Sequence, residues 1–261
     1  MKIPDWLDNL IFNTLGAHYH PVYADMTNID DNREKTLNYL GTYFPRSYAE
    51  AYCIFKEYFE QNLNCFSDKS EISIFDFGSG TGGEIIGLLT LLNERFPKLK
   101  KVRIVALDGN QDALLVYEEI LSSCEEQLRF LIESRPAHIH INFSKLDVLN
   151  SLMDEKFDII VSFKAICEFA AKQQFDKKNP YQHIAEFLTP KLKNDGMMLL
   201  EDITVKDNVS NEWLPEMMDK GLGKAKCRVV AQNEGYNQIY TITHSNKQND
   251  VSKVAWRMIK L

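Results

Sequence analysis

The sequence predicts an α/β fold with a mainly parallel sheet, an antiparallel C-terminal part and a set of N-terminal helices. From residue 71 onward, strand-like and helix-like segments alternate, which is typical of parallel sheets with connecting helices. A glycine-rich turn over residues 78–83 joins the first of these strands to a helix. Beyond residue 226 the segments are β-rich and joined by Asn/Gly or Asn/Asp turns, which favours antiparallel pairing.

The first 70 residues are predicted to form a helical cap. A helix near the N-terminus is indicated by apolar residues at helical spacing, namely Ile3, Trp6, Leu7, Leu10 and Ile11. A second helix is expected around 33–43 and a longer one over 46–64, with Pro45 as the break between them. The predicted domains are therefore the cap over 1–70 and the α/β domain over 71–261.

Within the α/β domain, each element is predicted from its hydrophobic pattern. Strands are expected near 72–77, 102–107, 138–143, 157–162 and 197–203. The intervening helices are expected near 83–95, 110–133, 145–153 and 164–192. The β-rich C-terminal segments cover 227–231, 238–244 and 251–259.

Composition and charge narrow the possible partners. The chain has no run of about 18 apolar residues and no apolar signal-peptide region, so no membrane partner and a cytoplasmic location are expected. Its five cysteines are scattered and never form C-x-x-C, so no metal is expected. The net charge of −7 disfavours broad nucleic-acid binding, which depends on neutralising phosphates.

The most informative stretch is the turn after the first predicted strand. That strand ends at Asp76, and glycines follow at positions 78, 80, 82 and 83. Strand, glycine turn and helix is the arrangement that brings backbone close to a nucleotide-like ligand. Gly78-x-Gly80-x-x-Gly83 also satisfies the dinucleotide fingerprint, so an NAD enzyme is an alternative if Gly83, rather than Gly82, is the functional third glycine.

A second acidic residue follows the next predicted strand. Residues 101–107 form a buried strand pattern that ends at Asp108-Gly109-Asn110. A carboxylate at this point can accept both hydroxyl hydrogens of a ribose, a device that NAD enzymes and methyltransferases share. A helix N-cap at Asp108 or Asn110 is a compatible alternative.

The order Asp76-x-Gly78-x-Gly80-x-Gly82 resembles motif I of the class I S-adenosylmethionine (SAM)-dependent methyltransferases. The resemblance implies a seven-stranded Rossmann-like sheet and SAM as the cofactor. In that reading the glycine loop cradles SAM, Asp76 holds its amino end and Asp108 its ribose. The implied cofactor-binding residues are Asp76, Gly78, Ser79, Gly80, Gly82, Asp108, Gly109, Asp147, Val148, Ser162 and Phe163. For Asp147, which would contact the adenine with Val148, an ordinary helix start is an equal alternative.

The acceptor site is expected after the fourth strand, near Lys164. Methyl transfer from a sulfonium needs mainly alignment and a dry pocket, so few catalytic side chains are required. Glu168 is the best-placed general base, although a solvated helix residue is an equal alternative. The predicted substrate-binding residues are Tyr43, Arg46, Tyr48 and Lys164.

The segment before the glycine loop carries a second resemblance. Tyr39 to Tyr43, followed by Arg46-Ser-Tyr48-Ala, is similar to the lead-in of the mitochondrial small-ribosomal-subunit methyltransferase-like family, whose downstream cysteine cluster is absent here. The favoured function is a SAM-dependent methyltransferase acting on a small-molecule or protein acceptor. The alternatives are an rRNA or tRNA methyltransferase, a non-catalytic SAM-binding ribosome assembly factor and an NAD-dependent oxidoreductase.

Overall fold

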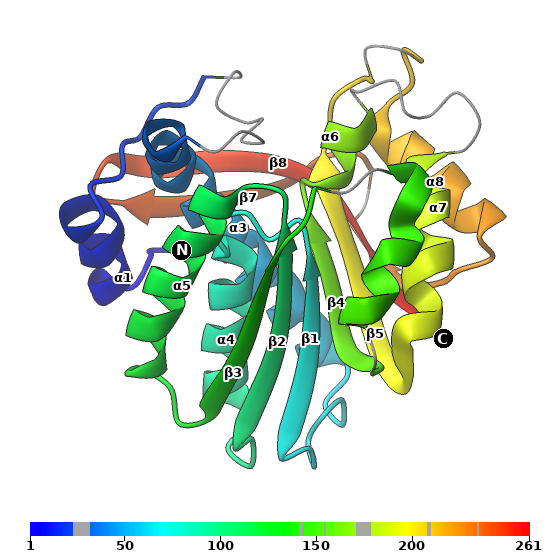
Figure 1. Ribbon diagram of the computed structural model, residues 1–261, viewed down its shortest axis with the longest axis horizontal. Coiled ribbons are helices and arrows are strands. Elements are labelled where there is room, and N and C mark those ends of the chain that lie inside the picture. Colours follow the sequence, from blue (N-terminus) through cyan, green and yellow to red (C-terminus); the bar gives the residue numbers. More distant parts are fainter. Residues whose placement is uncertain (23–31, 141–142, 154, 171–178, 208–209, 234) are drawn as a thin grey trace. The chain divides into compact units, whose positions relative to one another are not determined.

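The computed structural model describes residues 1–22, 32–140, 143–153, 155–170, 179–207, 210–233 and 235–261 (Figure 1). In this part of the chain the strands are β1 (Glu71–Phe77), β2 (Lys101–Asp108), β3 (Leu131–His138), β4 (Phe157–Phe163), β5 (Leu192–Ile203), β6 (Arg228–Gln232), β7 (Gln238–His244) and β8 (Lys247–Lys260). The helices are α1 (Asp5–Asn9), α3 (Arg33–Gln61), α4 (Gly83–Arg95), α5 (Gln111–Glu125), α6 (Ile166–Ala170), α7 (Pro180–Leu188) and α8 (Leu214–Lys224). A π-helical turn follows α1 at Leu10–Thr14, and 3-10 helices cover Phe143–Leu152 and Thr189–Lys191.

The strand order is β3-β2-β1-β4-β5-β8-β6, and β7 pairs with β8 outside this path. β4 pairs in parallel with β1 and β5, and β2 in parallel with β3. β8 runs antiparallel to β5 and β6. The predicted fold class is therefore confirmed: a mainly parallel α/β sheet that ends in an antiparallel C-terminal strand.

The described chain groups into two compact units. The first comprises Met1–Glu71, Ser79–Ile139 and Ile239–Ser252, and the second comprises Ile72–Gly78, His140–Gln238 and Lys253–Leu261. The N-terminal helices thus share a unit with α4, β2, α5 and β3. A separate cap over residues 1–70 stays a prediction.

In the first unit, the predicted helix break at Pro45 is wrong, because α3 is continuous with Pro45 inside it. A proline in a helix interior costs about 3 kcal/mol. Close packing against α4 offsets this cost on both sides of Pro45, and the two helices lie side by side in Figure 1. A methyl group at Gly83 would lie 2.5 Å from the carbonyl oxygen of Phe44, and one at Gly87 would overlap the carbonyl of Tyr48.

The first unit also contains a buried ion pair. Two guanidinium nitrogens of Arg46, Nε and Nη2, donate to the Asp250 carboxylate at 2.7 and 2.8 Å. The Tyr19 hydroxyl donates to Asp250 at 3.0 Å, and His244 Nε2 lies 4.0 Å from it. Burial raises the pKa of Asp250, but His244, Arg46 and Tyr19 together outweigh burial and lower it well below its usual range.

We expect Asp250→Asn to lower the free energy of unfolding by roughly 2–4 kcal/mol at neutral pH, because largely buried Arg46 loses its charge partner. The folded-state pKa of Asp250 is depressed, so its stabilisation is complete above the unfolded-state pKa of about 4 and is lost as the pH falls below it. Urea unfolding of the wild type and of Asp250→Asn measures this effect. The difference between their free energies of unfolding should become smaller as the pH is lowered from about 7 to about 3. A gap that stays constant with pH would contradict this expectation.

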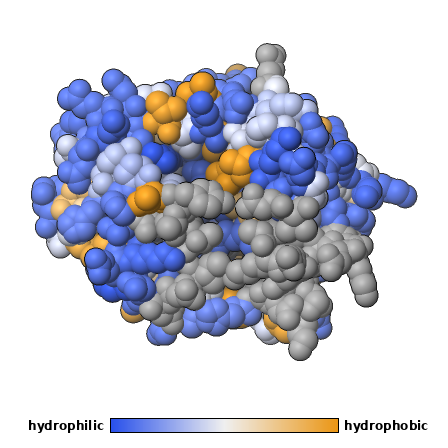
Figure 2. All heavy atoms as spheres, turned by 90° about the horizontal axis from the view of Figure 1, so that it is seen from above, coloured by the Kyte–Doolittle hydropathy of each residue, from blue (hydrophilic) through white to orange (hydrophobic). Residues whose placement is uncertain are grey.

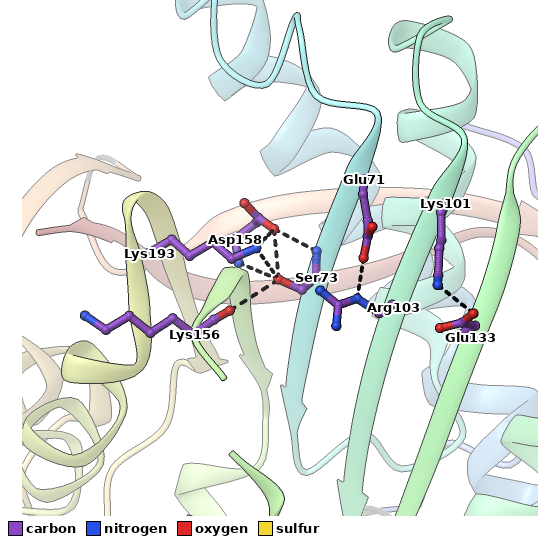
Figure 3. A network of polar contacts seen from close by, with 8 residues as sticks. All are labelled: Glu71, Ser73, Lys101, Arg103, Glu133, Lys156, Asp158 and Lys193. Atoms are coloured by element: carbon purple, nitrogen blue, oxygen red, sulfur yellow. Dashed lines mark hydrogen bonds and ion pairs between the residues drawn. The ribbon is translucent and has the colours of Figure 1, made fainter. Parts of the chain in front are cut away.

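In the second unit, a buried carboxylate links the amino ends of three strands (Figure 3). Asp158 on β4 accepts hydrogen bonds from the backbone N–H and the hydroxyl of Ser73 on β1, both at 2.8 Å. Lys193 on β5 donates to the same carboxylate at 2.7 Å and to the Ser73 hydroxyl at 3.0 Å. Since ligands of open α/β sheets bind at the carboxyl ends of the strands, this network is structural.

Three further element predictions need correction. The helix expected over 110–133 ends at Glu125 as α5, and the third strand is β3 at Leu131–His138 rather than 138–143, of which 141 and 142 lie outside the described residues. The region 164–192 contains α6 and α7 as separate helices, with 171–178 outside the described residues. α8 was not predicted. Its sequence contains Pro215, Gly221 and Gly223, which lower the helical signal.

Candidate cofactor-binding site

The loop between β1 and α4 follows a path that glycine adopts easily and other residues rarely. Gly78, Gly80 and Gly82 have φ values of 79°, 48° and 82°, all in the left-handed region. Every second residue therefore lacks a side chain where the chain turns from strand to helix. The loop presents backbone, rather than side chains, to whatever approaches it.

The structure separates the roles of the last two glycines. Gly82 is the left-handed residue immediately before α4, and a methyl group there would overlap the ring of Tyr117. Gly83 is already helical, and its missing side chain makes room for Phe44 and Ser47 of α3. The loop glycines are thus 78, 80 and 82, and Gly83 serves helix packing.

The carboxylate of Asp108, at the end of β2, is hydrogen-bonded to the glycine loop. Oδ2 accepts from the Gly80 N–H at 2.7 Å, and Oδ1 accepts from the Asn110 N–H at 2.7 Å. Burial raises the pKa of Asp108, against the lowering effect of these backbone amides. The N-cap of α5 is Asn110, whose side chain accepts from the Ala113 N–H at 3.0 Å. Because a carboxylate oxygen can accept more than one hydrogen bond, Asp108 retains capacity for a ligand hydroxyl.

Ser79 adds a polar group to the loop. Its backbone N–H donates to the Leu107 carbonyl at 2.9 Å, which ties the loop to β2. Its side chain is 2% exposed, and its hydroxyl has no hydrogen-bond partner among the residues that the structure describes.

In the second unit, Asp76 and Ser162 lie at or near the carboxyl ends of paired strands. Both are fully buried, on β1 and β4 respectively, and the hydroxyl of Ser162 has no hydrogen-bond partner within the described ranges. Phe163, the last residue of β4, is also buried. Gly78 leaves room for Ala165, whose Cβ a methyl group there would overlap.

The chain leaves β4 through a strained residue. Lys164 is buried and has a φ of 54°, which is uncommon for a residue with a side chain. Its backbone N–H donates to the Glu201 carbonyl at 3.0 Å. Cys167 N–H donates to the Asp202 carboxylate at 2.9 Å. Burial, with Asp202 nearby, raises the pKa of the Cys167 thiol well above its ordinary value, so this thiol stays protonated.

The other predicted cofactor and catalytic residues are more exposed. The carbonyl oxygen of Gly109 lies 3.0 Å from His138 Nε2. Asp147 and Val148 are exposed on the 3-10 helix Phe143–Leu152, which begins five residues after β3 ends. Glu168 is half-buried in α6. The roles of these residues stay predictions.

The predicted substrate-binding residues of α3 face different surroundings. Tyr48 is 1% exposed, and burial raises its pKa to about 12. Tyr43 is buried, and Arg46 is held by Asp250. Substrate binding by these three residues stays a prediction. Sequence reasoning did not select Tyr39 as a site residue, and its ring lies 3.5 Å from the position that a Cβ on Gly80 would take. Its spacing of four from Tyr43 places both on one helix face, but only the tertiary structure brings that face to the loop.

The described residues show no metal centre and no membrane-spanning helix. They contain no group of three or more His, Cys, Asp or Glu side chains that could hold a metal ion. None of the helices within the described ranges is both long and apolar enough to cross a membrane. On the face shown in Figure 2, the described residues are mainly hydrophilic, and hydrophobic side chains occur in small separate groups.

Solved methyltransferase structures are similar to this chain. An O-methyltransferase family protein from Burkholderia thailandensis matches with a TM-score of 0.53 at 12% identity, over 98% of this chain and 68% of that chain. A SAM-dependent methyltransferase from Clostridium acetobutylicum has a TM-score of 0.48 at 15% identity, over 83% and 91%. An O-methyltransferase from Bacillus cereus in complex with SAH (S-adenosylhomocysteine) has a TM-score of 0.49 at 12% identity, over 99% and 92%.

The chain therefore has the fold of the class I SAM-dependent methyltransferases. At these identities the likeness extends to the fold alone. No protein-family model matches the sequence, and no curated protein gives a significant match.

Proposed function

We propose that this protein is a SAM-dependent methyltransferase that binds SAM with the glycine loop and Asp108. The observation that carries the proposal is the hydrogen bond from Gly80 to Asp108 within a loop of left-handed glycines. It sets a carboxylate suited to ribose hydroxyls beside a loop whose glycines leave room for close approach. The buried Ser79 hydroxyl adds a polar group on the same loop.

The conformation of Gly82 favours the methyltransferase spacing of the loop glycines. Gly82 adopts the left-handed conformation that turns the loop. Gly83 packs against α3, and because the third glycine of a dinucleotide fingerprint also has a packing role, Gly83 does not separate SAM from NAD. The spacing Gly78-x-Gly80-x-Gly82 is the one that resembles the methyltransferase motif.

In the proposed reaction, a nucleophilic atom of the acceptor attacks the methyl carbon of SAM in line with the carbon–sulfur bond. That bond breaks, its electron pair stays on sulfur, and neutral SAH leaves. The acceptor's proton passes to a base, for which we retain the half-buried Glu168 of α6 as the candidate. We propose a small molecule or a protein side chain as the acceptor, because a net charge of −7 is unfavourable for an RNA partner.

Calorimetric titration with SAM, SAH and NAD tests the cofactor assignment. We expect SAM and SAH to bind and NAD not to bind. Asp108→Ala should lower the affinity for SAM by about tenfold or more, since hydrogen bonds to charged groups contribute about 1.5–3 kcal/mol. Asp108→Asn, which keeps an acceptor for the loop amides, should retain more affinity.

Glu118→Ala is the matched control, because it removes an exposed carboxylate from the helix that follows Asp108. It should leave SAM affinity unchanged. Binding of NAD, or of none of the three ligands, would overturn the proposed function. SAM binding without any methylated product in an extract supplied with labelled SAM would leave a SAM-binding protein without turnover.

A further inference from the structure

The phenol of Tyr39 approaches the glycine loop from α3. A methyl group placed at Gly80 would lie 3.5 Å from both Cε1 and the hydroxyl oxygen of Tyr39, which is ordinary van der Waals distance. The side of Gly80 that a side chain would occupy therefore faces the hydroxyl end of this ring. The N–H of the same glycine donates to Asp108. Gly80 thus donates to a carboxylate, and a phenol borders the space where its side chain would be.

A row of side chains along α3 holds this ring in place. The ring centroids of Tyr39 and Tyr43 are 5.1 Å apart with an angle of 37° between the ring planes. The guanidinium carbon of Arg46 lies 5.4 Å from the Tyr43 ring centroid, within the range of a cation–π contact. Arg46 is in turn fixed by its two hydrogen bonds to Asp250. The orientation of Tyr39 is thus supported through Tyr43 by a buried ion pair.

The chemistry of SAM places its charge beside the ribose. The sulfonium sulfur is bonded to the 5′ carbon of the ribose, whose hydroxyls Asp108 accepts in the proposed function. In the proposed function, an aromatic ring that borders Gly80, next to Asp108, would lie on the ribose side of SAM, to which the sulfonium is bonded. Aromatic faces attract cations, and the attraction strengthens where water is excluded. SAH contains a neutral thioether at the same position and gains nothing from such a ring.

We propose that Tyr39, supported by Tyr43, contacts the cofactor and recognises the positive charge of the SAM sulfonium. This inference rests on the proposed function and adds to it a basis for distinguishing SAM from SAH. Stronger attraction for the charged cofactor favours release of SAH after each methyl transfer and its replacement by SAM.

Titration of SAM and SAH against Tyr39→Leu and Tyr39→Phe tests the inference. Tyr39→Leu should lower the affinity for SAM by about threefold to thirtyfold, the range expected for loss of a cation–π contact. The affinity for SAH should fall by less than about twofold, because its neutral sulfur gives the ring no positive charge to attract. Tyr39→Phe keeps an aromatic face and should retain the preference for SAM.

Tyr52→Leu is the matched control on the same helix, where Tyr52 donates to Glu94 at 2.6 Å. It should leave the ratio of the two affinities unchanged, since that ratio does not respond to a general loss of stability. If the wild type binds neither ligand, the proposed function fails and this inference fails with it. If the wild type binds both, and Tyr39→Leu changes both equally or changes neither, the inference alone is overturned.

Discussion

Replacing Gly82 with alanine is expected to cost about 3 kcal/mol or more of unfolding free energy, from backbone strain and overpacking together. The residue has a φ of 82°, where a side chain is disfavoured. The added methyl group would also overlap Cδ2 of Tyr117 and lie 2.9 Å from Cε2. Tyr117 is fully buried, and its hydroxyl lies 3.2 Å from that of Ser134, so the ring has little freedom to move aside. Urea or thermal unfolding measures the loss.

Gly16→Ala separates the two causes. Gly16 has a φ of 72°, but a methyl group there would meet no atom within 4 Å. This control should lose only the strain energy of about 1–2 kcal/mol. Because the Gly82 substitution also moves the loop, it should abolish SAM binding, whereas Gly16→Ala should preserve it. Equal destabilisation of the two variants would show that the overlap with Tyr117 is relieved at no cost.

A loss of about 1–3 kcal/mol is expected when Asp158 is replaced with alanine, because the buried Ser73 N–H is left without its acceptor, whereas the Lys193 side chain is 37% exposed and water can solvate its charge. The carboxylate is 0% exposed. Without it, the backbone N–H of Ser73 and the ammonium group of Lys193 lose their shared acceptor at the amino ends of three strands. Chemical denaturation of the variant measures the change.

Two further variants serve as controls for the stability loss expected in Asp158→Ala. Asp195→Ala removes an exposed carboxylate from β5, the strand that carries Lys193, and should change stability by less than about 0.5 kcal/mol. Asp158→Asn retains an acceptor of similar shape without the charge and should lie between alanine and the wild type. SAM binding should survive in folded Asp158→Asn, because the network is at the opposite ends of the strands from the ligand side. A stability of Asp158→Ala close to that of Asp195→Ala would rule out the network as a major stabilising element.

Local signals in the sequence were sufficient to predict the glycine loop and the strand before it. The glycines, the apolar run that precedes them and the acidic residue after β2 each follow from short-range chemistry. The loop conformation and the position of Asp108 were therefore predictable in kind. The sequence did not predict which of Gly82 and Gly83 turns the loop, because the answer depends on contacts with α3 and α5.

Elements were mispredicted where tertiary contacts or an edge position outweigh local preference. β3 is the terminal strand of the sheet order, and its sequence includes exposed residues and Pro136, so it lacks the apolar pattern of a central strand. The helix α8 contains Gly221, whose missing side chain allows close packing on α7 near Gln182. Pro45 likewise remains helical because α3 is packed against α4.

The division of the chain into two units has a consequence for its synthesis. Strand β8 contributes Lys247–Ser252 to the first unit and the residues from Lys253 onward to the second. No contiguous fragment contains either unit whole, because the chain passes repeatedly between them. On the ribosome, neither unit can complete its contacts before β8 has emerged. Partly made chains therefore expose unpaired strand edges until that point, and such edges favour aggregation.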